Sequence, residues 1–125
     1  MENKKMKPTE SELEILQILW QKQSATVREV YEEILKIKPA GGYTTTLKLM
    51  QIMIDKGIVT RDSSNKSHVY KPAISKEKTQ NIFVNKMIDS LFAGSPVQLI
   101  MQALGNHKAS KKELDEIRDY LNSIK

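Results

Sequence analysis

The chain has 125 residues, of which 39% are hydrophobic and 28% charged, and 20 basic against 15 acidic side chains give a formal charge of +5. This length excludes large multidomain catalytic architectures, and the composition is typical of a globular chain. The absence of cysteine excludes disulfides, thiolate metal sites and thiol chemistry. No apolar stretch approaches the roughly 20 residues that span a bilayer. We therefore expect a cytoplasmic protein without direct membrane binding.

Two amphipathic helices are predicted in the first part of the chain, starting near residues 9 and 26. In both, apolar side chains recur three and four residues apart, as on the buried face of a helix. Each helix opens on a capping box, in which a hydroxyl and a carboxylate satisfy two backbone N–H groups. The boxes pair Thr9 with Glu12 and Thr26 with Glu29.

A third helix is predicted over residues 43–56, after a turn marked by Pro39 and two glycines. Gly57 supplies the left-handed residue that commonly closes a helix. The apolar face carries Thr46, Leu49, Met50, Met53 and Ile54, and the polar face carries Thr44, Lys48, Gln51 and Asp55. A β-hairpin is predicted next, with strands over residues 58–61 and 67–71 and a basic, serine-rich turn.

Only helices are predicted beyond Pro72. Ser75 can cap the first, Pro96 suits the first turn of the second, and Ser110 with Glu113 forms a third capping box. Three short helices cannot easily bury their apolar stripes alone, so we expect a second copy of the chain to cover them; packing within one chain is the alternative. The expected dimerisation residues are Phe83, Met87, Leu91, Val97, Ile100, Met101, Leu104, Leu114, Ile117, Leu121 and Ile124.

The order helix, helix, turn, helix and hairpin is that of a winged helix-turn-helix domain, whose third helix enters the DNA major groove. We therefore predict a mainly α fold with a small β-hairpin. An N-terminal winged helix-turn-helix domain would occupy residues 1–72, and a C-terminal three-helix dimerisation domain residues 73–125.

The third helix and the hairpin supply side chains that suit double-stranded DNA. Short polar side chains at the helix start let the backbone approach the groove, and longer donors one turn later reach base edges. Residues 43–72 contain five basic and two acidic side chains. The candidate DNA-binding residues are Tyr43, Thr44, Thr45, Lys48, Gln51, Arg61, Lys66, Ser67 and His68. The simpler interpretations are helix capping for the two threonines and a solvated surface for Lys48, Gln51 and His68.

The chain resembles, over nearly its whole length, the penicillinase-repressor family of bacterial transcription repressors, the BlaI/MecI/CopY group. The matching motifs are Thr9-Glu10-Ser11-Glu12-Leu13-Glu14-Ile15-Leu16 with Leu19-Trp20, Thr26-Val27-Arg28-Glu29-Val30, Tyr43-Thr44-Thr45-Thr46-Leu47, Asp55-Lys56-Gly57 and His68-Val69-Tyr70-Lys71-Pro72. The resemblance implies a homodimer with an N-terminal winged-helix domain on DNA and a C-terminal helical domain that joins the subunits. Members typically repress resistance genes and their own operon, and many are paired with a membrane sensor metalloprotease that cleaves the repressor.

Three departures from the family's pattern limit what the resemblance implies. Ile52 stands where many members have arginine, so one expected phosphate or base contact is missing and the operator sequence does not carry over. Members cut by the sensor protease have an Asn-Phe pair where this chain reads Met101-Gln102-Ala103-Leu104, so cleavage at that pair is not expected, or another bond is used. The copper-responsive branch has a C-terminal cysteine cluster, which is absent here, so copper sensing is not expected.

The sequence thus predicts a sequence-specific repressor, a homodimer on an inverted-repeat (palindromic) operator that controls a resistance or stress operon together with a membrane sensor protease. The alternative is a winged-helix protein-interaction module without specific DNA binding, which usually has an apolar or acidic outer face on its third helix. An enzyme is not expected, because no nucleophile–base pair, metal triad or phosphate-binding glycine loop has a recognisable spacing. We expect no cofactor and no metal site.

Overall fold

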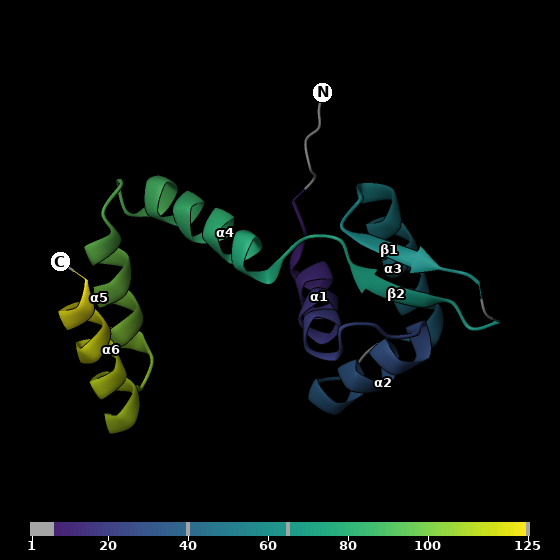
Figure 1. The fold of residues 1–125 in the computed structure, drawn as a ribbon, viewed down its shortest axis with the longest axis horizontal. Coiled ribbons are helices and arrows are strands. Elements are labelled where there is room, and N and C mark those ends of the chain that lie inside the picture. The colour runs from purple at the N-terminus through teal and green to yellow at the C-terminus, as the bar shows by residue number, and fades with distance from the viewer. Residues whose placement is uncertain (1–6, 40, 65, 125) are drawn as a thin grey trace. The chain divides into compact units, whose positions relative to one another are not determined.

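The protein is described by a computed structural model over residues 7–39, 41–64 and 66–124 (Figure 1). Its elements are α1 (Glu10–Lys22), α2 (Val27–Ile37), α3 (Tyr43–Lys56), β1 (Val59–Asp62), β2 (Val69–Pro72), α4 (Lys76–Leu91), α5 (Pro96–Asn106) and α6 (Lys111–Ser123). The mainly helical fold with one antiparallel hairpin confirms the predicted fold class. The chain divides into two compact units, Met1–Thr79 and Gln80–Lys125, so α4 begins in the first unit and continues in the second.

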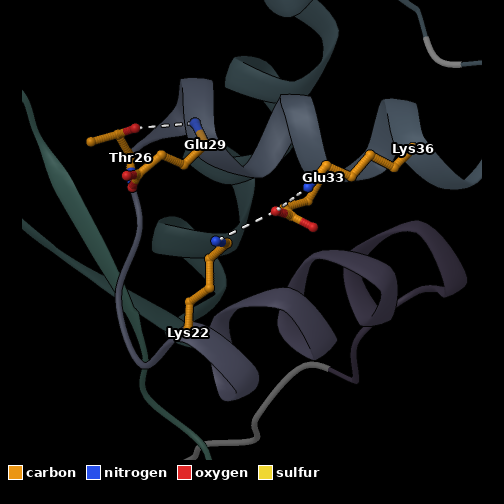
Figure 2. Close-up of polar contacts among 5 residues, drawn as sticks. All are labelled: Lys22, Thr26, Glu29, Glu33 and Lys36. Carbon is orange, nitrogen blue, oxygen red and sulfur yellow. Dashed lines mark hydrogen bonds and ion pairs between the residues drawn. The ribbon is translucent and has the colours of Figure 1, made fainter.

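The three capping boxes predicted from the sequence are present at the helix starts. In each predicted capping box, the hydroxyl of the N-cap residue accepts a hydrogen bond from the backbone N–H three residues later, and the carboxylate of that later residue accepts one from the N-cap N–H. Figure 2 shows the box of Thr26 and Glu29. The three boxes pair Thr9 with Glu12, Thr26 with Glu29 and Ser110 with Glu113, with donor–acceptor distances of 2.9–3.2 Å. Because each bond satisfies a backbone donor that the helix leaves unpaired, the boxes set where α1, α2 and α6 begin.

The first unit has one hydrophobic core between its three helices and its hairpin. Its fully buried side chains are Ile15, Leu16, Leu19, Val30, Met50, Met53, Ile58, Val59 and Tyr70. The buried residues of α3 are Thr46, Met50 and Met53, all from the face that the periodicity predicts to be apolar. The opposite face of α3 is therefore held toward solvent.

The first strand begins at residue 59 instead of the predicted residue 58, because the backbone N–H of Ile58 takes part in the C-terminal hydrogen bonds of α3. That group donates to the Met53 carbonyl oxygen at 3.1 Å, while Gly57 takes the left-handed conformation with φ 80°. β1 thus starts at Val59, and its register pairs it with Pro72 of β2.

A bridge outside the hairpin ties it to the segment between α1 and α2. Ala25 and Tyr70 exchange two backbone hydrogen bonds, of 3.0 and 2.8 Å, and both residues are buried. The hairpin is therefore held against the helices by main-chain bonds as well as by side-chain packing.

Ion pairs join α1 to α2 along their exposed edge. Glu33 of α2 accepts from Lys36 at 3.1 Å and pairs with Lys22 of α1 at 3.4 Å (Figure 2). The hydrogen bond from Lys36, helped by the nearby charge of Lys22, lowers the pKa of Glu33 below its ordinary value. Lys38 of α2 pairs with Glu14 of α1 at 2.9 Å. Such exposed pairs contribute little to stability, because solvent screens their charges, so packing rather than charge determines how the helices meet.

The second unit carries its apolar side chains on the outside. Of residues 80–124, which the structure describes, none is buried in the single chain. The large apolar side chains exposed there are Ile82, Val84, Met87, Leu91, Val97, Ile100, Met101, Leu104, Leu114, Tyr120, Leu121 and Ile124. Phe83 and Ile117 are half-buried. Over the described part of the chain, no helix is long and apolar enough to cross a membrane.

Candidate nucleic-acid interface

The exposed face of α3 presents short polar side chains first and longer donors one turn later. Thr44, Thr45, Lys48 and Gln51 are all exposed, as is Asp55 at the far end. The N-cap of α3 is Gly42, whose backbone conformation is extended, so neither threonine caps the helix. The capping alternative is therefore wrong for Thr44 and Thr45, and their hydroxyls are not used at the helix start.

Tyr43, the first residue of α3, is held by its own domain. Its ring meets the Tyr31 ring edge-on, with centroids 6.0 Å apart and planes at 86°. The Arg28 guanidinium carbon lies 4.6 Å from the centroid of the Tyr43 ring. The side chain is half-buried and packs against the core. Tyr43 thus connects the start of α2 to the start of α3, and its contact with DNA stays a prediction.

The hairpin turn brings its polar side chains to the start of α2. Lys66, Ser67 and His68 are exposed and line a cavity of about 310 Å³ together with Tyr43. We call this cavity the α2–hairpin notch; its lining residues are Thr26, Val27, Arg28, Tyr43, Leu47, Lys66, Ser67, His68 and Tyr70. Four of the predicted residues therefore meet in one place. Thr44, Thr45, Lys48, Gln51 and Arg61 do not line the notch.

Arg28 is the notch residue that sequence reasoning missed. It was visible only as part of the second capping-box motif, where it occupies the second position of α2. No periodicity or spacing connects it to residues 66–68, which follow almost forty positions later. Arg28 and residues 66–68 line one cavity because α2 packs against α3, and α3 packs against the hairpin.

Of the two acidic side chains on this surface, Asp55 and Asp62, the second is held by a local hydrogen bond. The Asp62 carboxylate at the end of β1 accepts a hydrogen bond of 2.9 Å from the Ser64 backbone N–H. That bond lowers the pKa of Asp62 below its ordinary value. Among the described residues, no group of three or more His, Cys, Asp or Glu side chains could hold a metal ion. The arrangement suits binding to an anionic polymer through lysine, arginine, threonine and glutamine donors.

Comparison with known proteins agrees with this geometry. The family described as penicillinase repressor matches residues 8–123. The chain belongs to the penicillinase repressor family. It is 30% identical to the penicillinase repressor of Staphylococcus aureus, with 99% of this chain and 98% of that one aligned. It is 27% identical to the methicillin resistance regulatory protein MecI of S. aureus strain N315, with 98% of each chain aligned. A penicillinase repressor of Bacillus licheniformis is 22% identical over 94% of this chain and 91% of its own.

The family confirms the resemblance inferred from the motifs and the general function inferred from the fold. Penicillinase repressors are DNA-binding transcriptional repressors and not enzymes. The protein is therefore a DNA-binding transcriptional repressor with a winged-helix arrangement of α1–α3 and the hairpin.

Proposed function

We propose that this protein is a homodimeric, sequence-specific repressor that binds an inverted-repeat operator and blocks transcription by occupying it. The observation that carries the proposal is the exposed face of α3, where Thr44, Thr45, Lys48 and Gln51 point away from a fully packed core. A helix held in this way can enter the major groove without rearrangement of the domain.

Each exposed side chain suits a different part of the groove. The threonine hydroxyls can bond phosphates, and their methyl groups can contact thymine methyls, whereas Lys48 and Gln51 are long enough to bond base edges. Ile52, which stands where many members of the family have arginine, is 39% exposed and offers an apolar contact instead of a donor. We infer that Arg61, Lys66, Ser67 and His68 contact the backbone beside the groove, because phosphates are the commonest partners of such side chains.

The second unit supports a dimer. Its large apolar side chains are exposed in the single chain, and exposed apolar surface of this extent marks an interaction site. A second copy, with the same stripes on α4, α5 and α6, would cover them. A two-fold dimer matches an operator whose half-sites lie roughly 34 Å apart, or a multiple of it, along the DNA.

The names of the relatives support a proposal about the kind of operon that this repressor controls. Because relatives are named for penicillinase and methicillin resistance, we propose that this repressor controls a resistance or stress operon. A membrane sensor metalloprotease would be the partner that releases it. Met101, Gln102, Ala103 and Leu104, which replace the family's cleaved Asn-Phe pair, lie within α5. Any such cleavage would therefore use a different peptide bond.

A DNA titration tests the proposal. The purified protein is titrated against a fragment of its own promoter and a scrambled fragment, at low and physiological salt, with the mass of the complex measured in the same sample. We expect saturable binding to the promoter fragment by one dimer per operator. Lys48→Ala should weaken that binding by about 1–3 kcal/mol if Lys48 contacts a base.

Lys36→Ala is the matched control, because Lys36 carries the same charge in the same unit but pairs with Glu33 on the α1–α2 edge. Its affinity for the promoter should equal that of the unmodified protein. Equal affinity of the unmodified protein for both fragments would contradict sequence-specific repression. An unaltered affinity and salt dependence in Lys48→Ala would remove Lys48 from the interface.

A further inference from the structure

The α2–hairpin notch gathers positive and donor groups from segments far apart in the sequence. Arg28 comes from α2, and Lys66 and His68 come from the turn between β1 and β2. None of the lining residues is acidic. Within the described part of the chain, no ion pair involves Arg28, Lys66 or His68. Cationic groups that no carboxylate neutralises attract an external anion.

The acidic residues nearest to the notch in sequence are engaged elsewhere. Glu29 follows Arg28, but its carboxylate accepts the backbone N–H of Thr26 at 2.9 Å in the capping box of α2 (Figure 2). Asp62 accepts from the backbone of Ser64. Neither carboxylate lines the notch. The basic side chains of the notch are therefore available to bind an anionic ligand.

Aromatic contacts orient Arg28. Its guanidinium lies over the Tyr43 ring at 4.6 Å, and Tyr43 is braced edge-on by Tyr31. A cation above an aromatic ring is attracted to the ring face, which restricts the arginine without using its hydrogen-bond donors. The planar guanidinium then presents several N–H groups in the fork geometry that matches phosphate oxygens. Restriction before binding lowers the entropy cost of the contact.

We propose that the α2–hairpin notch binds a backbone phosphate of DNA, with Arg28 as its main donor and Lys66 and His68 contributed by the hairpin turn. This inference rests on the proposed DNA-binding function and adds to it a contact from α2, outside the groove-facing side of α3. A phosphate contact positions the protein but carries no sequence information. The notch should therefore raise affinity for every DNA sequence alike.

Arg28→Gln tests the notch through the salt dependence of binding. Each phosphate contact contributes a slope of about −0.9 to a plot of log affinity against log salt concentration. We expect Arg28→Gln to reduce the magnitude of the slope by about 0.9. Its affinity should fall by the same factor for the promoter fragment and for the scrambled fragment. Arg28→Lys should keep the slope, because a cation remains within reach of the phosphate.

Arg118→Gln is the matched control, since Arg118 is an exposed arginine that pairs with Asp115 on α6 of the other unit. Its slope should equal that of the unmodified protein. Circular dichroism verifies that Arg28→Gln is folded; if it is not, Lys66→Gln makes the same measurement from the hairpin side.

The outcomes separate this inference from the function on which it rests. If the unmodified protein binds the promoter specifically and Arg28→Gln has the same salt-dependence slope, the phosphate site in the notch is contradicted. The repressor proposal is then unaffected. If Arg28→Gln no longer prefers the promoter fragment over the scrambled fragment, the phosphate site is contradicted too, because that result indicates a base contact. Equal binding of the unmodified protein to both fragments, with a reduced slope in Arg28→Gln, overturns only the sequence-specific function. The absence of any DNA binding overturns both.

Discussion

Trp20, at the end of the family motif in α1, bonds to the segment that follows the hairpin. Its indole N–H donates a hydrogen bond of 3.0 Å to the backbone carbonyl of Ile74, which lies 54 residues later. One turn into α4, Thr79 is buried and its hydroxyl donates to the Ser75 carbonyl at 2.7 Å. The Trp20 bond attaches the segment that follows the hairpin to α1, whereas the Thr79 bond stays within the first turn of α4.

Trp20→Phe should destabilise the first unit by about 1 kcal/mol, because the Ile74 carbonyl loses its donor while part-buried. Trp20 is the single tryptophan of the chain, so unfolding in urea is followed by circular dichroism rather than by fluorescence. The neighbouring exposed Gln21→Ala should change stability by less than about 0.5 kcal/mol. If the two variants are equally stable, the indole hydrogen bond contributes nothing measurable.

Among the elements, α1 and α3 are tied by a part-buried ion pair. The Glu12 carboxylate, only 2% exposed, accepts from the Thr9 backbone N–H at 2.9 Å and from the Lys56 ammonium at 2.7 Å. Thr9 and Glu12 begin α1, whereas Lys56 is the last residue of α3. One carboxylate therefore both caps α1 and fixes the end of the helix that is proposed to enter the groove.

Glu12→Ala should cost about 3 kcal/mol, since it removes the cap bond and leaves the Lys56 ammonium without its carboxylate. The matched control is Glu29→Ala, which removes the equivalent bond from the exposed box of α2 and should cost about 1 kcal/mol. Denaturation midpoints of both variants measure the difference. Equal losses would show that the pair with Lys56 adds no stability.

For the whole molecule, the contrast between the two units supports the proposal that the first binds DNA and the second forms the dimer. The first unit has a closed core, whereas residues 80–124 have apolar stripes and no buried residue. Isolated short helices are marginal in water, so the second unit needs further burial to be stable. A second copy supplies that burial in the proposed dimer.

Leu121→Glu should convert the dimer to a monomer, because Leu121 is 55% exposed in the single chain and a buried carboxylate at an apolar interface is costly. Sedimentation velocity at micromolar concentration measures the change. Asp119→Ala on the same helix should remain dimeric. A Leu121→Glu protein that is still a dimer would place the interface elsewhere, and a monomeric unmodified protein would contradict the homodimer itself.

The sequence by itself determined the helices, the capping boxes of α1, α2 and α6, and the buried face of α3. These features depend on residues three and four apart, such as Thr26 with Glu29, or on single residues such as Gly57, so their physics is local. The family, and with it DNA binding, was also readable, because the motifs follow one another along the chain. The strand bounds were less accurate, since the close of α3 uses the N–H of Ile58.

Only the tertiary structure decided which distant residues meet. Arg28 lies over the Tyr43 ring and lines one cavity with residues 66–68, because α2, α3 and the hairpin share one core. The bonds of Trp20 to Ile74 and of Lys56 to Glu12 likewise span more than forty residues. No periodicity encodes such pairs: each forms only when burial of apolar side chains brings its elements together, and the same burial leaves the polar face of α3 outside.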